Sequence, residues 1–149
     1  MRVIFREATA DDLPEVIRLI RQDARNVTIS SDDMALFQRS WENMQKNCTN
    51  RLFVGVAGDR VVATYQLAVI HGVSLSAARR GQIESVRVDA ELRSSGIGAQ
   101  LMADAESRAR DAGCDLMQLT TDSSRLRAHA FYERLGYKPS HLGFKKPLG

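Results

Sequence analysis

The spacing of hydrophobic residues along the chain changes between the period of a strand and that of a helix. Residues 2–9 alternate as in a short strand, and residues 9–24 then place apolar side chains at helical spacing. The start of this helix carries two possible capping boxes, Thr9 with Asp12 or Asp12 with Glu15. The opening of the chain therefore predicts a strand followed by an amphipathic helix with one buried face.

A second helix is predicted over residues 32–47, after a polar connection at 26–33. Its apolar side chains are spaced three and four residues apart, as on one face of a helix. Such a stripe favours packing against a core over lining a ligand site. Its members are Met34, Phe37, Trp41 and Met44.

The rest of the chain alternates strands with helices. Residues 51–70 read as a hairpin turning at 57–59, and strands are predicted at 82–89 and 114–121. Helices are predicted at 97–113 and 123–136, each ended by glycine, and one or two strands at 137–148. This order predicts a mixed α/β sheet with helices on both faces, including a right-handed parallel crossover.

Composition restricts the class of protein. With 149 residues, 44% of them hydrophobic and 26% charged, the chain suits one globular domain. Its net charge of +3 fits an anionic ligand or a well-solvated mixed surface, and lacks the basic stripe of a nucleic-acid binder. Cys48 and Cys114 have no metal-site spacing, so we expect no metal. Without a secretory leader or an apolar run of spanning length, we expect a cytoplasmic protein and no membrane partner.

The loop between the strand at 82–89 and the helix at 97–113 carries the first candidate chemistry. Its sequence places an arginine, two serines and two glycines directly before a helix. The first N–H groups of a helix lack intrahelical partners and attract anions, and glycine lets a phosphate approach the backbone. A tight turn is the other explanation. Leu101 excludes the third glycine of a dinucleotide fingerprint, and no Gly-Lys-Ser/Thr marks a P-loop.

The wider context resembles the GCN5-related N-acetyltransferase (GNAT) superfamily. The loop is similar to that family's acetyl-coenzyme A loop, and FYERLGY at 131–137 is similar to its penultimate-helix signature. Residues 5–20 resemble the family's opening strand and helix, so the resemblance covers nearly the whole chain. It implies a single domain over 1–149, with a mixed sheet of about six or seven strands flanked by about four helices. Two neighbouring parallel strands would splay apart to hold the cofactor.

The resemblance also implies an acetyl-CoA site. Backbone groups of Val86, Arg87 and Val88 would pair with the pantetheine arm as an added strand does. Arg125 replaces a frequent asparagine of the family, and it would either meet a phosphate of the coenzyme or lie in solvent. Amides of the loop would hold the pyrophosphate, with the next residue close by: Arg93, Ser94, Ser95, Gly96, Ile97, Gly98 and Ala99.

The resemblance implies two catalytic residues. Glu84 would act as general base through water, and strand alternation places it on the face of Val86 and Val88, partly buried. Tyr132 would be the general acid to the departing thiolate. A structural glutamate paired with a nearby arginine and a core tyrosine are the alternatives. The implied activity is direct transfer of an acetyl group from acetyl-CoA to a primary amine within a ternary complex.

The acceptor is not named by any motif. It would approach near residues 25–33 and the loop at 71–81, where Arg79 and Arg80 would attract an anionic group or face solvent. A small-molecule amine and a protein amine both fit. A coenzyme A sensor or partner-binding module without enzymatic activity is the alternative function, and a homodimer is compatible with the fold.

Overall fold

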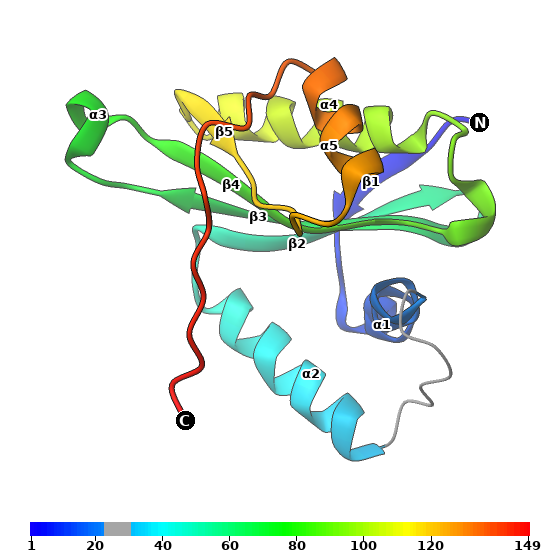
Figure 1. The fold of residues 1–149 in the computed structure, drawn as a ribbon. Helices are drawn as coiled ribbons and strands as arrows, with labels where there is room; N and C mark the ends of the chain where they lie inside the picture. Colours follow the sequence, from blue (N-terminus) through cyan, green and yellow to red (C-terminus); the bar gives the residue numbers. More distant parts are fainter. Residues whose placement is uncertain (23–30) are drawn as a thin grey trace.

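A mixed sheet forms the centre of the molecule (Figure 1). The structure is a computed structural model that describes residues 1–22 and 31–149. The described strands form one five-stranded sheet in the order β1-β2-β3-β4-β5, antiparallel up to β4, with β5 parallel to β4. The strands are β1 (Ile4–Glu7), β2 (Asn50–Ala57), β3 (Arg60–Ile70), β4 (Arg80–Val88) and β5 (Leu116–Gln118).

Helices cover both faces of this sheet, as the sequence predicts (Figure 1). One face carries α1 (Leu13–Arg21) and α2 (Ser31–Gln45), and the other carries α4 (Ile97–Asp111) and α5 (Leu126–Arg134). Short helical turns complete the described elements: η1 (Ala10–Asp12), α3 (Ser74–Ala77) and η2 (Ala90–Leu92). None of the helices in residues 1–22 and 31–149 is both long and apolar enough to cross a bilayer.

The strand predicted at the C-terminus is wrong for the single chain. Residues 138–149 form neither helix nor strand, and all of them are exposed. The described sheet therefore has five strands where six or seven were expected. The strand expected at 114–121 is also shorter, since only Leu116–Gln118 pair with β4. A strand needs a neighbouring edge for its backbone hydrogen bonds, and in the described chain the C-terminal segment pairs with no strand.

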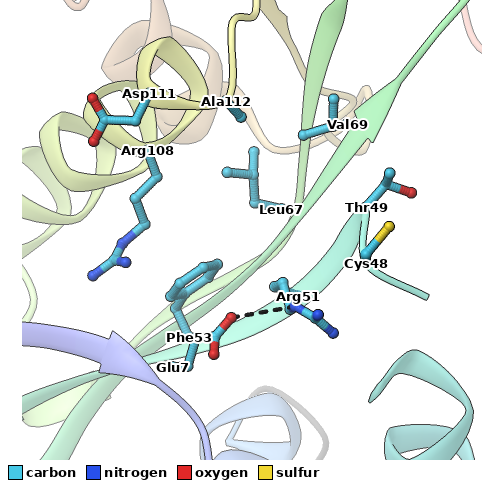
Figure 2. A pocket seen from close by; sticks show the side chains of 10 residues that line it. All are labelled: Glu7, Cys48, Thr49, Arg51, Phe53, Leu67, Val69, Arg108, Asp111 and Ala112. Atoms are coloured by element: carbon cyan, nitrogen blue, oxygen red, sulfur yellow. Dashed lines mark ion pairs between the residues drawn. The ribbon is translucent and has the colours of Figure 1, made fainter. Parts of the chain in front are cut away.

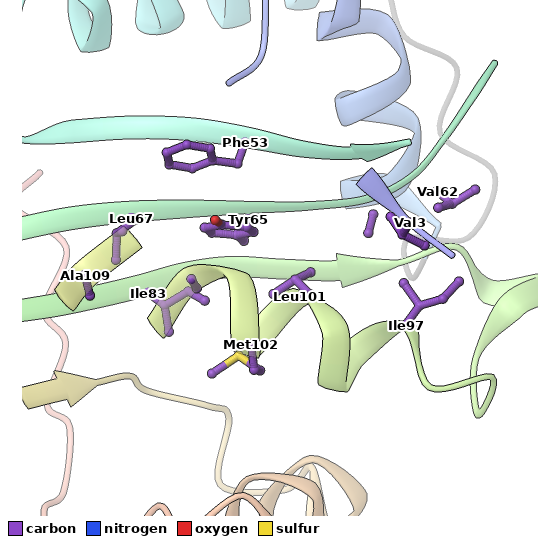
Figure 3. Close-up of a cluster of buried hydrophobic side chains, with 12 residues drawn as sticks. Val3, Phe53, Val62, Tyr65, Leu67, Ile83, Ile97, Leu101, Met102 and Ala109 are labelled. Carbon is purple, nitrogen blue, oxygen red and sulfur yellow. The ribbon is translucent and has the colours of Figure 1, made fainter. Parts of the chain in front are cut away.

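The main core lies between the sheet and α4 (Figure 3). Leu101 and Ala105 of α4 are fully buried against Tyr65 of β3 and Ile83 of β4. The Tyr65 hydroxyl donates to the carboxylate of Asp104 at 2.5 Å, which gives this buried polar group a partner. Burying each large apolar side chain contributes about 1.5–3 kcal/mol, so this layer fixes α4 on the sheet.

The N-terminal capping box is the one formed by Thr9 and Asp12. The Thr9 N–H donates to the Asp12 carboxylate at 2.7 Å, and the Asp12 N–H donates back to the Thr9 carbonyl at 3.0 Å. Arg6 adds a two-pronged ion pair to the same carboxylate. The hydrogen bonds from Arg6, against the opposing effect of burial, lower the pKa of Asp12.

The apolar stripe of α2 does not join the core, contrary to expectation. Its four members are only half-buried, and none belongs to either cluster of buried residues in the described chain. The reason is position: α2 packs mainly on β2 and α1, at the rim of the sheet. One side of the stripe therefore stays uncovered. The four residues are Met34, Phe37, Trp41 and Met44.

Candidate active site

An opening between β4 and β5 lies at the centre of the candidate site. The two parallel strands pair at Arg80 with Leu116, Gly81 with Met117 and Gln82 with Gln118, and the pairing ends there. Strand β4 continues to Val88, so its edge from residue 83 onward has no β5 partner. An added strand can therefore pair along this part of the β4 edge.

A β-bulge in β4 decides which way its side chains face. Thr64 of β3 pairs with Arg87 but Gln66 pairs with Glu84, so Ser85 and Val86 together face one residue. Ser85 adopts a left-handed conformation with φ of 52°. The extra residue reverses the alternation of the strand at this point.

The bulge corrects the predicted position of Glu84. Val86 and Val88 pack against the α4 core, together with Ile83. Directly opposed residues of a ladder share a face, and Glu84 is opposite Gln66 on the α1/α2 face. Glu84 is therefore exposed and separated from the two valines, where sequence alternation predicted partial burial beside them.

The loop before α4 holds its backbone in conformations that suit anion binding. Ser94 and Gly96 both have positive φ, 63° and 85°, and Gly96 is the N-cap of α4. Only glycine adopts this conformation without steric cost. The Ser95 hydroxyl bonds the Leu92 carbonyl, and Ile97 anchors the first turn in the core. This arrangement leaves the first N–H groups of a 15-residue helix without intrahelical acceptors.

The structure gives Gly98 a role in helix packing. A Cβ at this position would lie 3.2 Å from Cζ of Phe131, so the glycine permits close packing of α4 against α5. A Cβ at Gly96 would meet no atom within 4 Å, and there the backbone conformation alone requires glycine. Of the two glycines expected to admit a phosphate, Gly98 therefore also serves the packing of α4 against α5.

Tyr132 follows Phe131 on α5 and is half-buried against the core. Its ring contacts Phe131 and Tyr137 edge-on, with centroids 5.1 Å and 6.0 Å away. Burial raises the pKa of Tyr132, and the charges of Arg125 and Arg87 partly oppose that shift. The hydroxyl thus keeps its proton at neutral pH while two cations lie within electrostatic range.

The other residues predicted to contact the cofactor lie around the same opening. Val86 and Val88 are half-buried, and the Arg87 guanidinium donates to the Val86 carbonyl at 2.9 Å. Arg125 is exposed at the N-cap of α5, where its N–H donates to the Asp122 carbonyl at 3.0 Å. Arg125 therefore lies at the start of α5, the helix that carries Tyr132, and its charge acts on the Tyr132 hydroxyl.

A buried carboxylate fixes the loop to α1. Asp89, with no exposed surface, accepts hydrogen bonds from Arg18 at 3.0 Å and Arg60 at 2.8 Å, and from the Glu91 N–H at 3.0 Å. Burial by itself would raise the pKa of Asp89, but the bonds from Glu91 and Arg18 outweigh it and lower the pKa. The Gln22 side chain also accepts from the Ala90 N–H at 2.9 Å. The turn that enters the loop before α4 is therefore held by side chains of Arg18, Gln22 and Arg60.

Sequence reasoning missed a row of polar side chains on the face that carries Glu84. Gln118 donates to Gln82 at 2.6 Å and accepts from Arg80 at 3.3 Å. Arg79, by contrast, donates to the Ala112 carbonyl at 2.7 Å and caps α4, so only Arg80 belongs to this row. The alternation of Arg80, Gln82 and Glu84 along β4 was the signal in the sequence that could have revealed this row. The connection at 25–30, expected near the acceptor, lies outside the described residues.

The residues present fit an extended, phosphate-bearing cofactor. The β4 edge beyond β5 leads to the N-terminus of α4, and the half-buried Tyr132 packs on the same core cluster as Val86 and Val88. The Thr121 hydroxyl, three residues past the last β4–β5 pair, is buried without a hydrogen-bond partner in the described chain. A bound group would satisfy it. In the described residues no cluster of His, Cys, Asp and Glu could hold a metal ion.

A separate pocket of about 340 Å³ lies toward the other end of α4 (Figure 2). It is lined by Phe53 and Leu67 of the sheet, by the Arg51–Glu7 ion pair and by Arg108 of α4. None of its ten lining residues belongs to the predicted cofactor or catalytic sets. This pocket is therefore separate from the residues predicted to bind the cofactor and to act in catalysis.

Comparison with known proteins decides the family. The Acetyltransferase (GNAT) family model matches residues 13–137. The chain belongs to the GNAT family. A transcriptional regulator from Bacillus halodurans C-125 has the same fold, with a TM-score of 0.91, 33% identity and coverage of 99% of this chain and 100% of that one. A predicted acetyltransferase from Clostridium acetobutylicum, solved with acetyl-CoA, shares the fold at 16% identity, with a TM-score of 0.75 and coverage of 99% and 97%.

One sequence relative of this GNAT protein has a named activity. Aminoalkylphosphonate N-acetyltransferase of Salmonella typhimurium is 47% identical over 68 residues, which cover 46% of this chain and 44% of that protein. An uncharacterised Bacillus subtilis protein is 33% identical over 55 residues, covering 37% of this chain and 34% of that protein. The chain thus matches less than half the length of either relative.

Proposed function

We propose that this GNAT protein is an acetyl-CoA-dependent N-acetyltransferase with a small primary amine as acceptor. One observation carries the proposal: the edge of β4 beyond the last β5 pair leads to the N-terminus of α4, and Tyr132 packs on the same core cluster as Val86 and Val88. A strand edge suits an extended amide-containing arm, and a helix N-terminus suits a pyrophosphate. Acetyl-CoA carries both, and it supplies an acetyl group activated as a thioester.

In this proposal the backbone of Val86 to Val88 binds the arm of the donor. The Val86 carbonyl already accepts from Arg87, so it would share its second lone pair with the arm. Residues Arg93 to Gly98 hold the pyrophosphate with backbone N–H groups, and Ala99 lies in the same first turn. The rigid Asp89 turn keeps these amides in place before the ligand arrives.

Glu84 is the proposed base. An alkylammonium has a pKa of about 10.4, so about one molecule in 10³ is neutral at pH 7. The exposed carboxylate of Glu84, on the open α1/α2 face, accepts the amine proton through a water molecule. Arg79 and Arg80 have other partners, the α4 C-terminus and Gln118, so neither is committed to Glu84.

Tyr132 is the proposed acid. Burial raises its pKa, so the phenolic proton is present for donation to the leaving sulfur. The Arg87 and Arg125 charges that act on Tyr132 also favour the negative charge that develops on that sulfur. In this proposal Glu84 takes the proton of the amine on one side of the sheet, and Tyr132 of α5 gives its proton to the leaving sulfur.

We further propose an acceptor with an anionic group, recognised by Arg80. Arg80 lies on the face of Glu84, and its bond to Gln118 brings the guanidinium toward the level of Gln82. Gln82 and Glu84 are two residues apart, about 7 Å along a strand, which matches the length of a short aminoalkyl chain. Guanidinium groups bind phosphonate and carboxylate oxygens well. The activity named for the Salmonella relative is consistent with this class.

Ligand-dependent unfolding of the full chain tests donor binding. Acetyl-CoA and coenzyme A should each raise the free energy of unfolding by about 2.7 kcal/mol at a hundredfold excess over Kd, and ATP should not. The acceptor is then tested by release of coenzyme A with 2-aminoethylphosphonate, β-alanine and propylamine. The phosphonate should be the best substrate, and Arg80→Gln should remove its advantage over propylamine. Absence of any shift at millimolar acetyl-CoA would disprove the proposal.

A coenzyme A-responsive regulator is the second candidate. The Bacillus halodurans protein, whose whole chain matches this one with a TM-score of 0.91, is a transcriptional regulator. Tight binding of acetyl-CoA together with no turnover on small amines or amine-bearing peptides would favour this function. Turnover that falls in the Glu84 and Tyr132 variants would favour the enzyme.

A further inference from the structure

The row of polar side chains on the face of Glu84 continues from β4 onto β3 and β2. The Gln66 side chain of β3 donates from Nε2 to Oδ1 of Asn50 on β2 at 3.0 Å. Gln66 pairs directly with Glu84 of β4, so these two side chains share one face of the sheet. Gln66 is therefore the β3 side chain that lies beside the proposed base.

The part of this face that carries Gln66 lies beyond the buried core. Helices α1 and α2 cover the face, and the buried residues beneath α1 include Val54 and Val61 (Figure 1). Leu52, which pairs with Gln66, only borders that cluster and is half-buried. Gln66 itself is half-buried and Glu84 is exposed. A solute that enters this face can therefore reach both side chains.

The hydrogen bond to Asn50 fixes the orientation of the Gln66 amide. Because Nε2 is engaged on the β2 side, Oε1 is directed away from Asn50. No described residue donates to this oxygen, and it is not among the buried side-chain atoms that lack a partner in the described chain. Glu84 likewise has no hydrogen bond or ion pair with any described residue. Two acceptor groups on opposed residues are thus open to a ligand.

Two such acceptors suit an amine. The Cβ atoms of directly opposed residues in an antiparallel pair lie about 4.5–5.5 Å apart. An alkylammonium donates up to three hydrogen bonds of about 2.7–3.2 Å, so one nitrogen can serve Gln66 Oε1 and the Glu84 carboxylate, or the water beside it, at once. An amide oxygen does not take up a proton at neutral pH. Gln66 therefore suits binding of the amine, and proton removal stays with Glu84.

We propose that Gln66 binds the amine of the acceptor and that Asn50 holds the Gln66 amide in the orientation this requires. The inference rests on the proposed N-acetyltransferase function. The ammonium donates one N–H to Oε1 of Gln66 and gives another proton through water to Glu84. The neutral primary amine that results keeps N–H groups, so it stays bonded to Gln66 after the proton has left. The anionic group of the same acceptor lies at Arg80, farther along the row.

Gln66→Leu tests the assignment, because it removes Oε1 and keeps an apolar body of similar length. The KM for 2-aminoethylphosphonate and that for propylamine should each rise about tenfold or more, as expected for loss of a hydrogen bond to a charged group. The KM for acetyl-CoA should not change. Gln66→Glu restores an oxygen and should recover most of the affinity for both amines. Gln38→Leu, the same change on the exposed side of α2, is the matched control and should alter neither KM.

An inhibitor without an amine separates amine binding from a general disturbance of the site. Ethylphosphonate keeps the anionic group of 2-aminoethylphosphonate, so its inhibition constant should be the same in Gln66→Leu as in wild type. Asn50→Leu should raise the KM for both amines, and Asn50→Asp should reverse this, because a carboxylate also accepts from Nε2.

Two results would overturn the assignment while the enzyme stays active. One is an unchanged KM for the amines in Gln66→Leu, and the other is an equal loss of ethylphosphonate inhibition in that variant. Absence of turnover on any amine by the wild-type protein would instead disprove the proposed function, and this inference with it.

Discussion

Gly98 and Phe131 join the first turn of α4, which follows the proposed cofactor loop, to the helix that carries Tyr132. A Cβ on Gly98 would approach Cζ of the Phe131 ring to 3.2 Å, tighter than ordinary van der Waals contact. Because Tyr132 is the next residue of α5, the distance between α4 and α5 sets the position of its hydroxyl. The glycine is therefore a positioning residue for the proposed acid, in addition to any part it has in phosphate binding.

Gly98→Ala should separate these two roles. The added methyl group pushes the Phe131 ring and costs about 1 kcal/mol of stability, as overpacking typically does. We expect kcat to fall more than the KM for acetyl-CoA rises, and Phe131→Leu to restore both stability and kcat. Steady-state kinetics and thermal unfolding of the single and double variants measure this.

Gly96→Ala is the matched control for that experiment. Its Cβ meets no atom within 4 Å, but its φ of 85° is unfavourable for alanine by about 1–2 kcal/mol. Here the KM for acetyl-CoA should rise, and Phe131→Leu should give no rescue. The packing explanation would be contradicted if Phe131→Leu rescued Gly96→Ala, or if it failed to rescue Gly98→Ala.

Glu84→Gln should lower kcat/KM for the amine by about a hundredfold at neutral pH. The deficit should shrink as the pH rises toward about 10, because the amine then loses its proton without help. Rates measured from pH 6.5 to 10 test this, with Glu91→Gln as a control for the same change of charge at an exposed site. Equal deficits at all pH values would remove Glu84 as the base.

Tyr132→Phe should lower kcat by about tenfold or more, while the half-buried ring keeps its contacts with Phe131 and Tyr137. The pKa of Tyr132 is raised above its usual value near 10, so its proton is lost only above that pH. The wild-type rate should therefore show no alkaline decline from this group below about pH 10. Turnover within twofold of wild type in the variant would exclude the acid role.

Asp89→Ala should destabilise the protein by about 3 kcal/mol, because it leaves Arg18 and Arg60 without their buried partner. This loss of stability is at the lower end of the range for breaking a buried ion pair, because the Arg60 side chain is 49% exposed. The KM for acetyl-CoA should also rise as the loop loosens. Denaturant unfolding and kinetics measure both.

The same variant has a defined pH dependence. A carboxylate with a lowered pKa stabilises the folded state above its unfolded pKa of about 3.9 and loses that contribution as the pH falls through the folded pKa. The difference in unfolding free energy between wild type and Asp89→Ala should thus be complete above about pH 5 and shrink in acid. A difference that grows below pH 4 would contradict the assigned pKa direction.

The sequence by itself determined most of the helices and strands and the family resemblance. Hydrophobic period located α1, α4 and the β2–β3 hairpin, because a buried face leaves its spacing in the sequence. The glycine loop and FYERLGY were recognisable because a left-handed turn and a tight helix crossing restrict residue type. The family model matches the same region, over residues 13–137.

Tertiary structure decided the rest, because it depends on contacts between distant residues. The bulge at Ser85 moves Glu84 to the opposite face from Val86, and only the register with β3 reveals it. The row of Arg80, Gln82 and Gln118 exists only when β4 and β5 pair. The C-terminal strand was predicted from local sequence, which does not specify a pairing partner, and in the single chain the segment stays unpaired.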